Sequence, residues 1–371
     1  MEKLRGVNLG NWLVLEKWMS EDLFRGTTAM DETYLCIELG PEKIRERLKV
    51  HRDEFITERD FEEIARMGFN AVRIPVPFFL FEDVGPYVHC YEYLDKAFDW
   101  AEKYKPKVLV DLHTAPGGHN GTDNSGICGI CTWSTKKENV DYTVEVLGKI
   151  AERWGERQAM WGIELLNEPM CSDTEAGRML NIQNFLQFYK PVDLELAKSN
   201  TNYPLEFLKQ FYRDAYTAIR RHMGPEKYVV IHDAFELNIW DEFLKEFEGM
   251  ILDTHNYLMT ADMMIFRERN VDVYTEYLQN LGAKVNAAAR RLPLIVGEWN
   301  AQNQADGLAD MTESEKTHLY YTVSEEFQKS MEDTMGWFYW SWKIHGDGGR
   351  DDIVDDACRA VRHGYLKFNK Q

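Results

Sequence analysis

The stretch Trp161-Gly-Ile-Glu-Leu-Leu-Asn-Glu-Pro169 decides the fold prediction for this chain of 371 residues. It is a short, mostly apolar run that ends in Asn167, Glu168 and Pro169, and such a run is typical of a strand buried on both faces. Proline cannot continue the hydrogen-bond ladder of a sheet. We therefore expect the strand to stop here, with Glu168 at its carboxyl end.

A second run, Pro293-Leu-Ile-Val-Gly-Glu298, repeats this arrangement far downstream. Two buried strands that each deliver one glutamate to the same edge of a sheet predict a pair of facing carboxyl groups. Glycoside hydrolysis needs such a pair, because one carboxyl gives a proton to the leaving oxygen while an ionised one attacks the sugar carbon or activates water. Either glutamate alone could equally be a satisfied carboxylate at a strand end, but the pair favours catalysis.

Strand-like apolar runs alternate with amphipathic, helix-like segments along the whole chain, and no linker or composition break divides it. This alternation predicts an α/β fold, a single-domain (β/α)8 TIM barrel over residues 1–371 with elaborated βα loops. Residues 10–56 are expected to form a long loop, and residues 172–202 give the weakest pattern. The predicted strands cover residues 4–9, 70–75, 107–113, 161–168, 228–232, 250–257, 293–298 and 336–341.

Polar or aromatic side chains stand at or near the ends of most of these strands. Because the carboxyl ends of barrel strands meet at one face, we expect these side chains to converge on an active site there. One of them is a buried arginine, which needs a carboxylate partner. The set comprises Arg73, His113, Asn167, Glu168, His255, Tyr257, Glu298 and Trp340.

The composition limits the partners of the chain. A net charge of -19 argues against nucleic acid and anionic membranes, and it suits a neutral oligosaccharide or glycoside substrate. No apolar run resembles a signal peptide or a membrane span, so we expect a cytoplasmic protein. The six cysteines include Cys128-Gly-Ile-Cys131, but no second pair follows at metal-binding spacing, which predicts free thiols in a loop.

The ordered strand-end set resembles glycoside hydrolase family 5 over nearly the whole chain. The matching residues stand in Arg73-Ile-Pro, Asn167-Glu168-Pro169, His255-Asn-Tyr257 and Gly-Glu298-Trp, together with His113 and Trp340. The stretches Gly6-Val-Asn-Leu-Gly-Asn-Trp-Leu-Val-Leu-Glu16 and Asp111-Leu-His-Thr-Ala-Pro-Gly-Gly-His-Asn-Gly-Thr-Asp-Asn-Ser-Gly126 are similar to its fungal exo-β-1,3-glucanase branch. The loop at residues 127–132 and the segment 343–349 depart from that branch.

The resemblance implies that Glu168 is the acid/base and Glu298 the nucleophile. It also implies a carboxyl separation of ~5 Å, which means retention of configuration through a glycosyl-enzyme. For these roles we expect Arg73 and Tyr257 to lower the pKa of Glu298, and an apolar surround with a nearby negative charge to raise that of Glu168.

The remaining members of the set are expected to bind the substrate. Asn167 is placed to bond the sugar 2-hydroxyl, and Trp340 to form the floor under the sugar. His113 and His255 would bind hydroxyls or orient the carboxylates, and Glu16 matches a substrate-binding position of the exo branch. No metal or cofactor is expected, because the histidines are scattered singly and the chemistry works without one.

The main hypothesis is a cytoplasmic retaining β-glycosidase of the β-glucosidase or exo-β-glucanase type, acting on short β-linked oligosaccharides. A β-mannosidase acting on β-mannosides, such as the Man-β-1,4-GlcNAc of an N-glycan core, remains an open alternative. Two further classes are a non-catalytic carbohydrate-binding barrel and a metal-dependent hydrolase on the same scaffold. The oligomeric state stays open.

Overall fold

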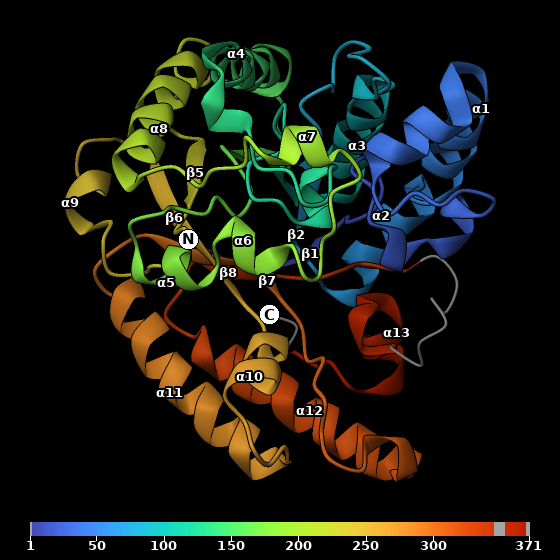
Figure 1. Cartoon of the computed structure of the whole chain (residues 1–371). Coiled ribbons are helices and arrows are strands. Elements are labelled where there is room, and N and C mark those ends of the chain that lie inside the picture. The colour runs from blue at the N-terminus through green and yellow to red at the C-terminus, as the bar shows by residue number, and fades with distance from the viewer. Residues whose placement is uncertain (1, 345–352, 369–371) are drawn as a thin grey trace.

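A computed structural model describes residues 2–344 and 353–368 of the chain, and its centre is a closed barrel of eight parallel strands (Figure 1). Each strand pairs with the next one in chain order, and β1 pairs with β8 to close the ring. This confirms the predicted (β/α)8 architecture. The strands are β1 Leu4–Asn8, β2 Ala71–Val76, β3 Lys107–Leu112, β4 Met160–Glu164, β5 Tyr228–His232, β6 Met250–Asn256, β7 Leu294–Trp299 and β8 Gly336–Tyr339.

Long helices surround the barrel, with α4 and α8 on one side of the view and α11 and α12 on the opposite side (Figure 1). The sequence signals for α2 are typical: Thr57 and Asp60 form a capping box at its start, and Gly68 ends it in a left-handed conformation with φ of 98°. None of the described helices combines the length and apolar character that crossing a bilayer requires. The outer helices are α2 Glu58–Met67, α3 Tyr91–Tyr104, α4 Lys137–Trp154, α8 Leu205–Ile219, α9 Asp241–Leu244, α11 Val271–Ala289, α12 Glu313–Ser330 and α13 Ala357–His363.

The structure differs from the sequence prediction mainly in the βα loops. The predicted loop over residues 10–56 is wrong, because it contains helix α1, Glu32–Glu54. Gly40, with φ of 73°, and Pro41 break that helix in its middle and interrupt its apolar pattern. Residues 345–349 of the departing segment lie outside the described residues. The other unpredicted elements are α5 Glu175–Met179, α6 Ile182–Phe185, α7 Leu194–Ala197, α10 Leu258–Met264 and short 3-10 turns at Lys17–Met19, Glu21–Phe24, Asp123–Ser125, Trp133–Thr135, Leu308–Asp310 and Ile353–Asp355.

The barrel interior changes from apolar to charged along the strands. Its apolar layer includes Ala71, Leu109 and Ile251. Because alternate residues of a strand face the same way, the residues two positions further along also point inward. These are Arg73, Asp111 and Asp253, all buried. The charged layer therefore lies directly above an apolar plug, toward the carboxyl ends of the strands.

Strand β7 breaks this alternation at Gly297. Val296 pairs with Thr254 and Glu298 pairs with His255, so Gly297 is an extra residue in the ladder, a β-bulge. A Cβ atom at Gly297 would lie 1.8 Å from Asp253 Oδ2, which only glycine avoids. The bulge turns the Glu298 side chain into the barrel.

Candidate active site

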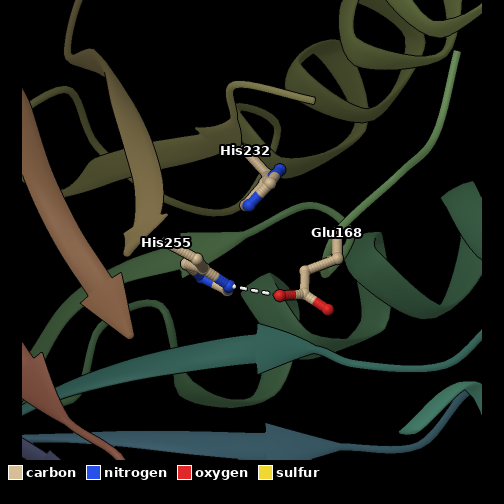
Figure 2. Close-up of side chains that lie close together, drawn as sticks. All are labelled: Glu168, His232 and His255. Carbon is tan, nitrogen blue, oxygen red and sulfur yellow. Dashed lines mark hydrogen bonds and ion pairs between the residues drawn. The ribbon is translucent and has the colours of Figure 1, made fainter. Parts of the chain in front are cut away.

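Two glutamates lie close to one histidine nitrogen: Glu168 in the turn beyond β4, which ends at Glu164 and not at Glu168 as the sequence predicted, and Glu298 in β7. His255 Nδ1 is 2.9 Å from Glu168 Oε1 (Figure 2) and 3.5 Å from Glu298 Oε2. These two carboxylate oxygens are therefore no farther apart than the sum of the two distances. That upper limit is compatible with the roughly 5–5.5 Å between the carboxyl groups of retaining glycosidases.

Glu298 is fixed by two further side chains from the predicted set. Arg73 Nη1 donates to Glu298 Oε1 at 2.9 Å, and the Tyr257 hydroxyl donates to Oε2 at 2.7 Å. The buried Arg73 has the carboxylate partners that the sequence required, since it also contacts Glu164 at 2.7 Å and Asp111 at 3.2 Å. One guanidinium thus binds three acidic side chains in the floor of the site.

Asn167 presents an unused donor. Its Oδ1 accepts from Arg73 Nη2 at 2.9 Å, whereas its buried Nδ2 has no hydrogen-bond partner in the described part of the chain. The backbone around it is tied to both neighbouring strands, because Leu165 N donates to Val230 O and Asn167 N to Leu112 O. Glu168 then adopts a positive φ of 47°, a conformation uncommon outside glycine and concentrated at functional sites. The side-chain Nδ2–H of Asn167 is therefore available to donate a hydrogen bond to a ligand.

The pKa shifts of the two glutamates run opposite to the sequence prediction, which is wrong on this point. Burial acts to raise the pKa of Glu168, but the hydrogen bond and positive charge of His255 outweigh it and lower that pKa to about 2. Burial raises the pKa of Glu298, and the positive charges of His255 and Arg73 offset it only in part.

The low pKa of Glu168 is caused by His255, which the sequence reasoning treated only as a hydroxyl ligand or orienting group. Burial acts against its charged form, yet the carboxylates of Glu298, Asp253 and Glu168 raise its pKa well above 6.5. These opposite pKa shifts favour the proton on His255 over Glu168.

His113 and Trp340 form one wall of the site. His113 Nδ1 is hydrogen-bonded to Asp111, and its ring stacks on Trp340 with 5.8 Å between ring centroids and 12° between planes. His113 Nε2 has no partner among the described residues, so it is available to a ligand. The Trp340–Ser341 peptide bond is cis. A Cβ at Gly10 would lie 2.9 Å from the Trp340 ring, so the first loop packs tightly against this wall.

Glu16 lies in an acidic corner of the same site. It is buried, and its Oε2 accepts from Trp18 Nε1 at 2.7 Å. Burial raises its pKa well above the ordinary value, and so do the negative charges of Asp123, Glu298 and Glu168. The structure thus brings all nine predicted site residues to the carboxyl end of one barrel.

Sequence reasoning missed several residues of this site. Asn124 Nδ2 donates to Glu168 Oε2 at 3.0 Å, and Asn8 Oδ1 accepts from Arg73 at 3.1 Å. Asn8 and Asn124 each stand in one of the two stretches that resemble the exo-glucanase branch. Asn8 also ends strand β1, and this position could have identified it as a site residue. Asn120 Nδ2 also donates to the backbone oxygen of Glu168, at 3.3 Å. The missed residues are Asn8, Asp111, Asn120, Asp123, Asn124, Glu164, His232 and Asp253.

Two groups of side chains have the donor types of a metal centre, Glu168 with His232 and His255 (Figure 2), and Glu164 with Asp253 and His255. A histidine ligand must offer a free lone pair. His255 is held protonated by its carboxylate neighbours, and His232 Nδ1 already accepts from the backbone N–H of Ala234 at 3.0 Å. The donor chemistry of these groups therefore fits an ion-pair network better than a metal site.

Comparisons with known proteins show the family and the fold of the chain. The family model described as "Cellulase (glycosyl hydrolase family 5)" matches residues 43–346. A "Glucan 1,3-beta-glucosidase" of Blumeria graminis is 32% identical over 92% of this chain and 82% of its own length, and a "Glucan 1,3-beta-glucosidase 2" of Wickerhamomyces anomalus is 30% identical over 92% and 83%. The crystal structure of rutinosidase from Aspergillus niger has a TM-score of 0.75 at 21% identity, covering 98% of both chains, and shares the fold.

Proposed function

Because this chain belongs to glycoside hydrolase family 5 and is a retaining β-glycosidase, we propose that it removes glucose from the ends of short β-linked oligosaccharides. The observation that carries this proposal is the placement of Glu168 and Glu298 against a single nitrogen of His255. The two relatives named above are both glucan 1,3-β-glucosidases, which supports a gluco-configured substrate.

In the proposed mechanism Glu298 attacks the anomeric carbon while Glu168 protonates the leaving oxygen. Water then hydrolyses the glycosyl-enzyme, with Glu168 taking a proton from that water. Glu168 starts out ionised, so it must gain a proton before the first step. His255 holds one at a hydrogen-bond distance of 2.9 Å and is placed to supply it when substrate covers the site.

The pH dependence of kcat/KM tests this placement of the proton. Activity should fall as the pH drops through the raised pKa of Glu298, because the nucleophile becomes protonated. It should also fall as the pH rises through the raised pKa of His255, because the proton for the leaving group is lost. We therefore expect a bell-shaped profile whose alkaline midpoint lies above the ordinary histidine value of 6.5.

The variant His255→Gln tests whether His255 supplies a proton to Glu168 or only forms a hydrogen bond with it, because glutamine can form the bond but carries no such proton. With no imidazolium, Glu168 must hold the proton itself, so the alkaline limb should move to lower pH. An unchanged alkaline limb would show that His255 does not hold the catalytic proton.

Asn167 is expected to act on the sugar 2-hydroxyl through its unused Nδ2–H. Asn167→Ala should lower kcat/KM for an aryl β-glucoside by about 10²-fold or more, because this contact strengthens in the transition state. The matching 2-deoxyglucoside lacks the contact already, so it should lose much less. An equal loss on both substrates would mean that Asn167 only supports Arg73.

The substrate proposal is tested with a panel of aryl β-glucosides, aryl β-mannosides and short β-linked oligosaccharides. Proton NMR should show the β-anomer as the first product, released one sugar at a time. Faster turnover of the mannosides than of the glucosides would show that the protein is a β-mannosidase instead. Binding without turnover would indicate a non-catalytic carbohydrate-binding barrel.

A metal-dependent mechanism makes a different prediction. Because His255 is engaged in ion pairs and His232 in a hydrogen bond from the backbone, incubation with EDTA followed by gel filtration should leave kcat/KM unchanged. Loss of activity that returns on adding a divalent cation would overturn this expectation.

A cytoplasmic location stays a prediction. Its support is the state of the six cysteines, which are all buried and all unpaired, as expected for a reducing compartment. Fractionation of the source cells with an antibody to the protein would test it.

A further inference from the structure

His232 ends strand β5, and its imidazole is fully buried beside the two catalytic glutamates. Its ring packs nearly perpendicular to the His255 ring, with 4.5 Å between ring centroids and 79° between planes. A ring nitrogen of His232, a carboxylate oxygen of Glu168 and a ring nitrogen of His255 all lie within 4.8 Å of one another. In Figure 2 a ring nitrogen of His232 points toward the space between His255 and Glu168. His232 is therefore a further side chain next to the acid/base, and it takes no part in the proton transfer from His255.

The turn after β5 fixes which nitrogen of His232 carries the hydrogen. Ala234 N donates to His232 Nδ1 at 3.0 Å, so Nδ1 offers its lone pair and the hydrogen is on Nε2. Ala234 and Phe235 adopt positive φ angles of 52° and 62° in succession, which is uncommon for residues other than glycine. Phe235 N donates to Asp233 Oδ1 at 2.8 Å and holds this turn. Burial and the positive charge of His255 lower the pKa of His232 well below 6.5, so the ring stays neutral.

The Nε2–H of His232 is a donor without an acceptor. The nitrogen is buried, and it has no hydrogen-bond partner among residues 2–344 and 353–368. A buried donor left in this way costs free energy, and native proteins contain few of them. Both oxygens of Glu168 are engaged elsewhere, Oε1 with His255 at 2.9 Å and Oε2 with Asn124 at 3.0 Å. His232 thus holds an unused donor near a carboxylate that is already bonded.

The hydrogen bonds of Glu168 change during the reaction. In the first step His255 passes its proton from Nδ1 to Glu168, which passes it to the leaving oxygen. Glu168 is then a carboxylate again, whereas His255 Nδ1 is a bare lone pair, so these two groups can no longer form a hydrogen bond. This sequence of states rests on the proposed function.

We propose that His232 is a positioning residue for the second step: its Nε2–H binds the Glu168 carboxylate in the glycosyl-enzyme and holds it toward the attacking water. Glu168 takes a proton from that water, whose oxygen bonds to the anomeric carbon as the bond to Glu298 breaks. The proton then returns from Glu168 to His255 Nδ1, which restores the starting state. His255 and His232 therefore serve the same carboxyl group in turn, one in each half of the reaction.

The variant His232→Phe tests this role, because it removes the donor and keeps a ring against His255. The substrate is 2,4-dinitrophenyl β-glucoside, whose leaving group departs without an acid, so kcat/KM reports formation of the glycosyl-enzyme and kcat its hydrolysis. We expect kcat to fall about tenfold and kcat/KM to stay within about twofold, so that KM falls too. Mass spectrometry during turnover should show more of the covalent glucosyl adduct in the variant than in the wild type.

Three further variants make the result specific. His232→Leu, a smaller donor-free replacement, should give the same split, which keeps the test independent of whether phenylalanine fits. His232→Gln retains an N–H donor and should keep kcat within about threefold of the wild type. Phe235→Leu is the matched control, because the Phe235 ring also packs on His232, with 4.9 Å between ring centroids, but supplies no donor. It should change neither kcat nor kcat/KM by more than about twofold.

An equal fall of kcat and kcat/KM in the donor-free variants would overturn the proposal, because it would mean that His232 only supports the His255 ring. An unchanged kcat, or a glutamine variant as slow as the leucine variant, would overturn it as well. If the wild type turned over no β-glucoside, the proposed function itself would fail, which is a distinguishable result.

Discussion

Glu298→Gly should reduce kcat for an aryl β-glucoside by on the order of 10⁵-fold, as expected when a catalytic nucleophile is removed. Added azide should restore turnover, because a small anion can enter the space left by the carboxylate. It would attack from the face that Glu298 occupies, so the product should be the α-glycosyl azide, identified by its anomeric NMR coupling.

Glu168→Gly is the matched variant, and it should give the opposite anomer. Glu298 is intact in it, so a glycosyl-enzyme still forms from a substrate with a good leaving group. Azide then attacks from the side that Glu168 occupies and yields the β-glycosyl azide. If both variants gave the same anomer, the assignment of the two roles would be wrong.

Arg73→Met should destabilise the protein by roughly 3–5 kcal/mol, because it leaves buried carboxylates without their counter-charge. Arg73 binds Glu164, Asp111 and Glu298 and is itself fully buried. Urea unfolding followed by tryptophan fluorescence would measure this loss, and activity should fall with it because Glu298 and Asn167 both lose their anchor.

Arg213→Met provides the control for the side-chain change itself. Arg213 makes two hydrogen bonds of 3.0 Å to Glu246 at the surface. Water screens this pair, so the urea midpoint should barely change. Equal shifts for the two variants would show that the buried cluster is not what Arg73 stabilises.

Much of the fold followed from local patterns, because buried strands and amphipathic helices carry strong periodic signals. Seven of the predicted strands match the structure closely, whereas the apolar run after Glu164 continues beyond β4 as irregular backbone. Helix α1 was missed because Gly40 and Pro41 interrupt it. The segment 172–202, with its short helices, lies close to Gly121 and Gly129, at Ile182 and Tyr189, and such tertiary contacts are not contained in a local pattern.

The residues of the active site could be predicted from the sequence, but the shifts of their pKa values could not. Residues at strand ends converge whenever a barrel forms, so Arg73, Glu168 and Glu298 could be grouped from the sequence alone. The protonation of His255 depends on three carboxylates from different strands at once. That dependence required distances. It reversed the predicted pKa of Glu168, whereas burial reversed that of Glu298.

The extra residue at Gly297 decides which side chain of β7 meets the substrate. Counting alternate positions inward from Ile295 would place Trp299 in the barrel lumen and the neighbouring acid among the outer helices. Instead Trp299 packs outside on Phe327, with 5.3 Å between ring centroids, and the acid turns inward. The one-residue bulge in the backbone of β7 thus places the carboxylate of Glu298 in the barrel. Without it, the indole of Trp299 would occupy that place.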